Sequence, residues 1–147
     1  MQQKRIRPLA LGIFRHDGRL LVFEGHEPIK RQTVYRPLGG GIEFGETGAQ
    51  AMAREMCEEI GAEVTNVRYL GLCENIFTHL GEMGHEIVLL YEAELVDRSL
   101  YERDVIEAVE ANGSTFMALW KPLSDFADGR VLLVPGGLFA LLESGQE

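Results

Sequence analysis

The sequence has few cysteines, few cations and no long apolar run, and each shortage excludes a class of protein. Two cysteines, Cys57 and Cys73, are too few for the disulfide framework of a small secreted domain or for a metal cluster by themselves. The apolar run near the N-terminus is broken at Arg15, which is too early for a signal peptide. No stretch approaches the roughly 20 apolar residues of a membrane span. We therefore expect a soluble cytoplasmic protein with no membrane partner.

The charge balance is strongly acidic. Lys and Arg number 14 against 23 Asp and Glu, which gives a formal net charge of -9. Because binding to a nucleic-acid backbone needs clustered cations, this balance argues against a nucleic-acid partner. Free nucleotides stay compatible with it, since bound cations can bridge a carboxylate-rich site to phosphate.

Length and patterning favour one mixed domain. At 147 residues and 46% hydrophobic content, the chain can bury the core of a single domain over residues 1–147. Apolar runs on both sides of Asp17-Gly18 predict a hairpin. Long strands are expected over residues 64–79 and 85–95, another over 114–123, and short helices near residues 123–129 and 137–144. Strands interleaved with a few helices predict a sheet covered by helices.

The best-defined element is a helix over residues 48–60. Thr47 and Gln50 have the spacing of a capping box, and Gly61 supplies a left-handed stop. Apolar residues recur at spacings of three and four and predict one buried stripe. The stripe consists of Ala49, Met52, Ala53, Met56 and Ile60.

The opposite side of this helix is expected to carry a cluster of charge. Glu55 lies three and four residues before Glu58 and Glu59, and each like-charge pair costs roughly 0.2–0.5 kcal/mol in an isolated helix. Arg54 is the nearest cation, in the less favourable order relative to Glu58. A divalent cation would reverse this balance, because ions such as Mg²⁺ bind carboxylate oxygens. For these glutamates alone, the alternative is a solvated acidic face.

The residues before the helix add a longer pattern. It reads Gly, five residues, Glu, seven residues, then Arg-Glu-U-x-Glu-Glu-x-Gly-U, where U is a bulky aliphatic residue. Its seven fixed places are filled by Gly40, Glu46, Arg54, Glu55, Glu58, Glu59 and Gly61. Seven such matches in register arise by chance on the order of once in 10⁸ to 10⁹. The chain thus resembles the Nudix hydrolases, with Met56 and Ala62 at the aliphatic places and Leu38 where proline often opens the signature.

The resemblance implies a fold and a metal site. The fold would be α/β, a Nudix-type α/β/α sandwich with a central mixed β-sheet. The ligands of a magnesium or manganese ion would be Glu55, Glu58 and Glu59, with the backbone of Gly40. Arg54 would hold the loop against the helix through Glu46, so that the ligands stay aimed.

The resemblance also implies hydrolysis of a phosphoric anhydride, which needs charge neutralisation, an activated water and a carboxylate base. Glu58 is the candidate base within the signature, and Glu107 or Glu110 could act from a later loop; the alternative for the latter two is an exposed turn. Arg36, next to the glycines, is a candidate phosphate contact, with a strand-edge role as its alternative. Glu86 is a further candidate to approach the metal.

The substrate is expected to be a small nucleotide, namely a nucleoside diphosphate linked to another group. Nucleotide sugars, ADP-ribose-like compounds and nucleoside triphosphates all fit that description. The family's marks for ADP-ribose and for dinucleoside polyphosphates are absent at residues 76–79, which read Ile-Phe-Thr-His. A non-catalytic nucleotide-binding or sensing module and a prenyl diphosphate isomerase on the same fold are the alternatives. A homodimer is compatible with the sequence.

Overall fold

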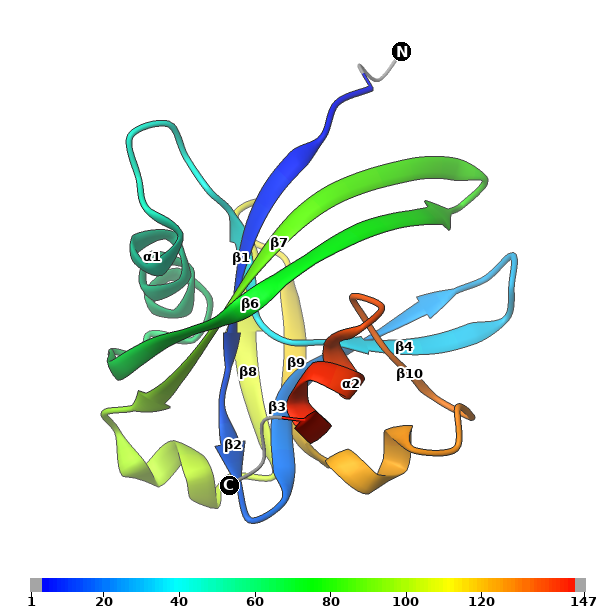
Figure 1. Cartoon of the computed structure of the whole chain (residues 1–147). Helices are drawn as coiled ribbons and strands as arrows, with labels where there is room; N and C mark the ends of the chain where they lie inside the picture. Colours follow the sequence, from blue (N-terminus) through cyan, green and yellow to red (C-terminus); the bar gives the residue numbers. More distant parts are fainter. Residues whose placement is uncertain (1–3, 145–147) are drawn as a thin grey trace.

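The computed structural model describes residues 4–144, and its strands form two sheets (Figure 1). The first sheet has four strands in the order β5-β1-β7-β6. Their bounds are β1 Arg7–Ile13, β5 Gly39–Gly41, β6 Val64–His79 and β7 Glu82–Leu95. β1 runs parallel to β7, whereas β1 with β5 and β6 with β7 are antiparallel. The sheet is therefore mixed.

The second sheet is ordered β10-β4-β3-β9-β8, and β2 pairs with β3 beside this path. Its strands are β2 Arg15–His16, β3 Arg19–Glu27, β4 Gln32–Arg36, β8 Val105–Val109, β9 Thr115–Pro122 and β10 Leu132–Leu133. The helices are α1 Gly48–Ile60, α2 Leu138–Ser144 and the short 3-10 helices η1 Arg98–Glu102 and η2 Leu123–Phe126. The predicted α/β fold with a mixed sheet is confirmed, with the strands divided between two sheets.

The two α-helices cover opposite faces of the four-stranded sheet (Figure 1). Successive side chains of a strand point to opposite faces, and β1 shows this clearly. Ala10 packs in one buried cluster with Met52 of α1, whereas Leu9 and Leu11 pack in a second cluster with Leu138 of α2. Both faces of β1 are thus buried, which explains its continuous apolar sequence.

The hairpin predicted around Asp17-Gly18 is shorter than expected. Both turn residues have positive φ, 51° and 74°, but only the two-residue strand β2 pairs with β3 across them. The preceding segment, β1, instead pairs with β5 and β7 in the other sheet. A strand buried on both faces cannot be assigned to a sheet from its apolar run alone, because it lacks the alternation that marks a single buried face.

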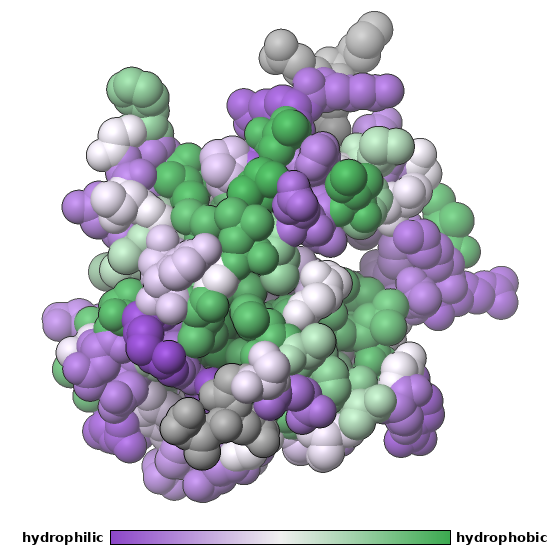
Figure 2. Space-filling view, in the orientation of Figure 1, coloured by the Kyte–Doolittle hydropathy of each residue, from purple (hydrophilic) through white to green (hydrophobic). Residues whose placement is uncertain are grey.

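The front face of the molecule in the orientation of Figure 1 carries an apolar band. Figure 2 shows these side chains down the middle of the face, with hydrophilic side chains on either side. Leu72 and Ile76 on β6 are among the exposed apolar residues, at 49% and 63% of their full surface. Within residues 4–144, the helices are all too short or too polar to cross a membrane.

Candidate active site

Helix α1 has the predicted limits and the predicted caps. The Thr47 hydroxyl accepts the N–H of Gln50, and the Gln50 side chain accepts the N–H of Thr47, which completes the capping box. Gly61 ends the helix with φ 66° and donates its N–H to the Cys57 carbonyl. Met52 and Met56 are buried as expected. Signature residues on this helix therefore have a fixed scaffold.

The buried face of α1 is rotated relative to the predicted stripe. Ala51 is fully buried, whereas Ala49, Ala53 and Ile60 are only partly buried. As a result, Glu55 and Glu59 turn toward the body of the protein and are also partly buried, and Glu58 stays exposed. The expectation that all three glutamates share an outer face is wrong. The helix borders strands β1, β5 and β8, and their approach shields two of its three carboxylates.

Gly40 and Glu55 meet at close range. A Cβ atom added to Gly40 would lie 2.6 Å from the Cδ and Oε2 atoms of Glu55. Such a distance is well inside van der Waals contact, so a side chain at Gly40 would displace the carboxylate. Gly40 lies on β5 opposite Ala10, and this pairing fixes the backbone against the helix. The glycine of the signature thus gives the Glu55 carboxylate room beside the β5 backbone.

Arg54 joins the loop before α1 to the helix. Its Nε and Nη2 atoms donate to the two Glu46 carboxylate oxygens at 2.7 and 3.0 Å, a bidentate pair. Nη2 also donates to the Gly41 carbonyl at 3.0 Å, and Nη1 donates to Glu55 at 2.9 Å and to Glu58 at 3.2 Å. Arg54 lowers the pKa of Glu46 to about 2, with help from the Glu43 N–H. The contact expected between Arg54 and Glu46 is present.

Glu59 has a carboxyl group whose pKa is strongly raised. Its Oε1 atom is buried without a hydrogen-bond partner among the described residues. Burial raises the pKa of Glu59 to about 7, and the negative charge of Glu55 adds to the rise. The charge of Arg36 and the N–H of Gly39 act in the opposite direction. A buried acceptor without a partner is costly and rare, and it marks a position where a cation would be stabilising.

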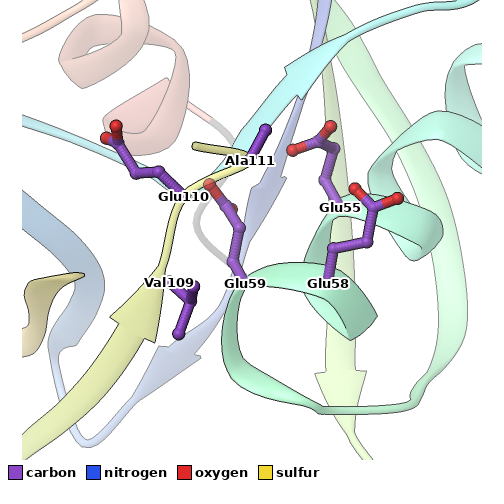
Figure 3. A pocket seen from close by; sticks show the side chains of 6 residues that line it. All are labelled: Glu55, Glu58, Glu59, Val109, Glu110 and Ala111. Carbon is purple, nitrogen blue, oxygen red and sulfur yellow. The ribbon is translucent and has the colours of Figure 1, made fainter. Parts of the chain in front are cut away.

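A pocket of about 530 Å³ brings the helix together with the β8–β9 connection (Figure 3). Glu55, Glu58 and Glu59 line one side, and Glu110 reaches the pocket from the end of β8. Glu107, in contrast, lies within β8 opposite Met117 and does not line the pocket. Of the two candidate bases outside the signature, the structure thus places Glu110 at the pocket and Glu107 away from it. The segment carrying them begins as a strand, because Ile106 and Ala108 alternate as buried residues.

The charge of Arg36 interacts with carboxylates of this pocket and of a second, larger groove. Its guanidinium carbon is 5.1 Å from the centre of the Phe23 ring, a cation–π contact. The Nε atom is buried without a partner within residues 4–144. Burial lowers the pKa of Arg36, and the nearby charges of Glu86 and Glu59 oppose that change. Arg36 therefore places a shielded positive charge between two carboxylates.

The second groove has a volume of about 1610 Å³ and runs along the β6–β7 hairpin. Its cationic residues, Lys4, Arg5 and Arg7, precede or begin β1, and Phe77 lies on β6. Glu86 closes the inner end, only 7% exposed, where Asn75 donates to it and Arg7 pairs with it at 3.7 Å. Sequence inspection missed this groove, because its residues come from distant segments.

The carboxylates fit a divalent cation by type, although they are not gathered around one. Within residues 4–144, no three His, Cys, Asp or Glu side chains converge closely enough to form a metal-ligand cluster. The unpartnered Glu59 oxygen and the Glu55 carboxylate beside Gly40 are hard oxygen donors at the pocket wall. The residues present therefore fit a cation such as Mg²⁺ or Mn²⁺.

Three aromatic side chains lie away from the pocket. Trp120 is buried in the core and donates its indole N–H to the Leu100 carbonyl, so it cannot stack on a nucleobase. His16 packs beside the rings of Tyr101 and Trp120. Phe77 is partly exposed and lines the second groove, with its ring beside Gly84 of β7.

Comparison with known proteins agrees with the signature. The NUDIX domain family matches residues 4–134. The chain therefore belongs to the Nudix hydrolase family. The NAD-capped RNA hydrolase NudC of Vibrio vulnificus is 31% identical over 126 residues, covering 78% of this chain and 46% of that protein. The NudC of Vibrio cholerae is 39% identical over 67 residues, covering 46% of this chain and 24% of that protein. The chain thus spans less than half the length of these relatives.

Solved structures share the fold at low sequence identity. A MutT NUDIX hydrolase from Burkholderia pseudomallei has a TM-score of 0.66 at 20% identity and covers 97% of this chain and 100% of its own. A NUDIX hydrolase from Nitrosomonas europaea has a TM-score of 0.64 at 15% identity and covers 95% of this chain and 87% of its own. These similarities confirm the fold.

Proposed function

We propose that this protein, acting as a single domain, is a metal-dependent pyrophosphohydrolase. Its substrate is a nucleoside diphosphate linked to another group. The observation that carries the proposal is the position of Glu59, whose unpartnered buried oxygen lies in one pocket with Glu55, Glu58 and Glu110. Folding that concentrates acidic groups around a buried acceptor is unfavourable without a counter-ion. A divalent cation bound by these carboxylates would offset that cost.

The cation ligands in this proposal are Glu55, Glu58 and Glu59, with the backbone of Gly40. A bound cation would neutralise charge on the phosphate oxygens and lower the pKa of the attacking water. Arg54 keeps the ligands aimed, because one guanidinium contacts Glu46 together with Glu55 and Glu58.

Glu58 is the proposed base, and Arg36 the proposed phosphate contact. Glu58 is exposed at the pocket wall, where a carboxylate can take a proton from water and release it to solvent. Glu110 is the competing base, because it lines the same pocket from the opposite side. Arg36 has an N–H group free of protein partners among the described residues and lies close to Glu59. A phosphate oxygen would satisfy that donor.

The larger groove would hold the group beyond the cleaved bond. Lys4, Arg5 and Arg7 suit an anionic group, and Phe77 offers a face for stacking. The NudC relatives act on NAD-capped RNA, which places a dinucleotide cap among the substrates to test. The acidic overall charge still predicts weak affinity for the RNA chain itself.

The test is product release from a panel of nucleotide sugars, ADP-ribose, NADH, nucleoside triphosphates and dinucleoside polyphosphates, with Mg²⁺, Mn²⁺ or EDTA. We expect cleavage of one class, abolished by EDTA and lowered at least about 100-fold by Glu59→Gln. Glu63→Gln, an exposed glutamate just past the same helix, is the matched control and should leave the rate unchanged. Tight nucleotide binding without cleavage of any compound would favour the binding module instead.

A further inference from the structure

Two hairpins from different sheets meet at their tips. The β3–β4 hairpin belongs to the second sheet and the β6–β7 hairpin to the first, and Figure 1 shows both projecting to the same side of the molecule. Glu27, the last residue of β3, lies at this meeting point and is only 5% exposed. Glu27 and Glu86 are the two buried charged residues in the described part of the chain. A buried carboxylate needs a reason to be there.

The Glu27 carboxylate binds both turns at once. Its Oε1 atom accepts the Leu80 N–H at 2.6 Å, and its Oε2 atom accepts the Lys30 N–H at 2.8 Å. Lys30 adds a second link, because its Nζ donates to the Thr78 carbonyl at 2.9 Å. These contacts connect residues about 50 positions apart, and we name them the hairpin clasp. The backbone N–H groups of Lys30 and Leu80 hold the pKa of Glu27 below its usual value, so the clasp is ionised.

The clasp also holds an unusual turn. Leu80 and Gly81 connect β6 to β7 with φ values of 53° and 80°. A two-residue hairpin turn with both φ values positive favours Asn-Gly or Gly-Gly, and leucine is a poor choice at the first place. The Leu80 N–H points to Glu27 and receives a strong charge-assisted hydrogen bond there. The conformation of this turn thus depends on a residue of the other sheet.

The clasp stands at the far end of the larger groove. His79, Leu80 and Gly81 line the groove at that end, whereas Arg7 and Glu86 line the end beside Arg36 and the glutamate pocket. Arg36 links the two regions electrostatically, because its charge interacts with Glu59 of the pocket and Glu86 of the groove. Under the proposed function, a group attached to phosphates at the pocket would extend past Arg36 toward the clasp.

We propose that Glu27 is a positioning residue that closes the far end of the groove and limits the length of the group that the substrate carries. This inference rests on the proposed function. A closed clasp favours substrates whose second group is the size of one nucleoside or sugar. Opening it frees the β6–β7 tip, removes the end wall and admits longer groups, such as an oligonucleotide attached to the cleaved diphosphate. The effect acts on binding, because Glu27 is remote from the reacting bond.

The test uses Glu27→Ala, Glu27→Gln and the control Glu74→Ala, which changes an exposed glutamate of β6. Hydrogen exchange at the Leu80 amide measures the clasp without any substrate. We expect exchange at least about 10-fold faster in Glu27→Ala, a smaller change in Glu27→Gln, which keeps one acceptor, and none in Glu74→Ala. Protection of the α1 amides should be equal in all forms, which shows that the fold is intact. Unchanged protection of Leu80 in both Glu27 variants would overturn the clasp.

The specificity claim is tested by the ratio of kcat/KM for ADP-ribose to kcat/KM for a short oligonucleotide carrying a 5′ dinucleotide cap. We expect Glu27→Ala to shift this ratio at least about 5-fold toward the longer substrate, through KM and with kcat nearly constant. If Leu80 exchanges faster in Glu27→Ala but the ratio of kcat/KM values does not change, the length limit is wrong. If the unmodified protein cleaves neither compound, the proposed function fails but the length limit can still be tested. The ratio of the dissociation constants for the two compounds then replaces the ratio of kcat/KM, and the same shift is expected in Glu27→Ala.

Discussion

Replacing Glu59 by Gln should stabilise the metal-free protein while removing its activity. The pKa of Glu59 is about 7 in the folded chain, against 4.5 for an ordinary glutamate. Below pH 4.5 the side chain is protonated in both states and its titration has no effect on stability. Between pH 4.5 and 7 the unfolded chain loses the proton and the folded chain keeps it, so the free energy of unfolding falls as pH rises. Above pH 7 the loss is complete and amounts to about 3 kcal/mol.

The assay is urea unfolding of the unmodified protein and of Glu59→Gln at pH 5 and pH 8 in EDTA. Groups distant from Glu59 titrate alike in both proteins, so the difference between them reports the Glu59 carboxyl and its coupling to neighbours such as Glu55. We expect the variant to be more stable by about 3 kcal/mol at pH 8 and by only about 1 kcal/mol or less at pH 5. Adding Mg²⁺ at pH 8 should stabilise the unmodified protein more than the variant. Parallel stability profiles at the two pH values would refute the account of Glu59 as a destabilising buried carboxylate.

Three further substitutions test the rest of the site. Arg54→Lys should lose the bidentate contact with Glu46, which lowers kcat/KM about 10-fold or more and the free energy of unfolding by about 1 to 3 kcal/mol, measured by kinetics and urea unfolding. Gly40→Ala should displace the Glu55 carboxylate and lower kcat at least about 10-fold while the protein stays folded by circular dichroism. Glu58→Gln should lower kcat about 100-fold or more, measured under saturating substrate.

The substitutions at Gly40 and Glu58 each have a matched comparison. Gly136→Ala adds a methyl group where no atom lies within 4 Å, so it should leave kcat unchanged, and an equal loss there would contradict the steric account of Gly40. Glu110→Gln removes the competing base. If Glu110→Gln abolishes turnover and Glu58→Gln does not, the proton acceptor is the residue on the β8–β9 connection.

The helix of the signature could be predicted from sequence because its limits are determined by residues close to its two ends. Thr47, Gln50 and Gly61 act within a few residues of the helix ends, and the structure places the ends where these residues put them. The side of the helix that faces the core could not be predicted as well. Strands from distant parts of the chain bury Ala51 fully and Glu55 partly, and the local periodicity of the helix sequence does not encode those contacts.

The same limit applies to the sheets and the groove. The division of strands between two sheets follows from β1 pairing with β7, which lies about 80 residues further along the chain. The groove joins residues before β1 to the β6–β7 hairpin, and the clasp joins Glu27 to Leu80. No residue spacing in the sequence predicts these contacts, because they join segments that only the folded chain brings together. In the sequence, the only local sign of the clasp is a glutamate at the end of an apolar run, followed by Pro28, and this pattern is too common to predict the contact with Leu80.

The most direct test of the central claim is a Mn²⁺ titration followed by calorimetry and by product release in parallel, on the unmodified protein and on Glu59→Gln. The account predicts that hydrolysis rises with Mn²⁺ occupancy, disappears in EDTA, and that the variant binds Mn²⁺ at least about 10-fold more weakly. Hydrolysis that persists in EDTA, or equal Mn²⁺ affinity in the two proteins, would contradict the assignment of the α1 glutamates as the metal platform.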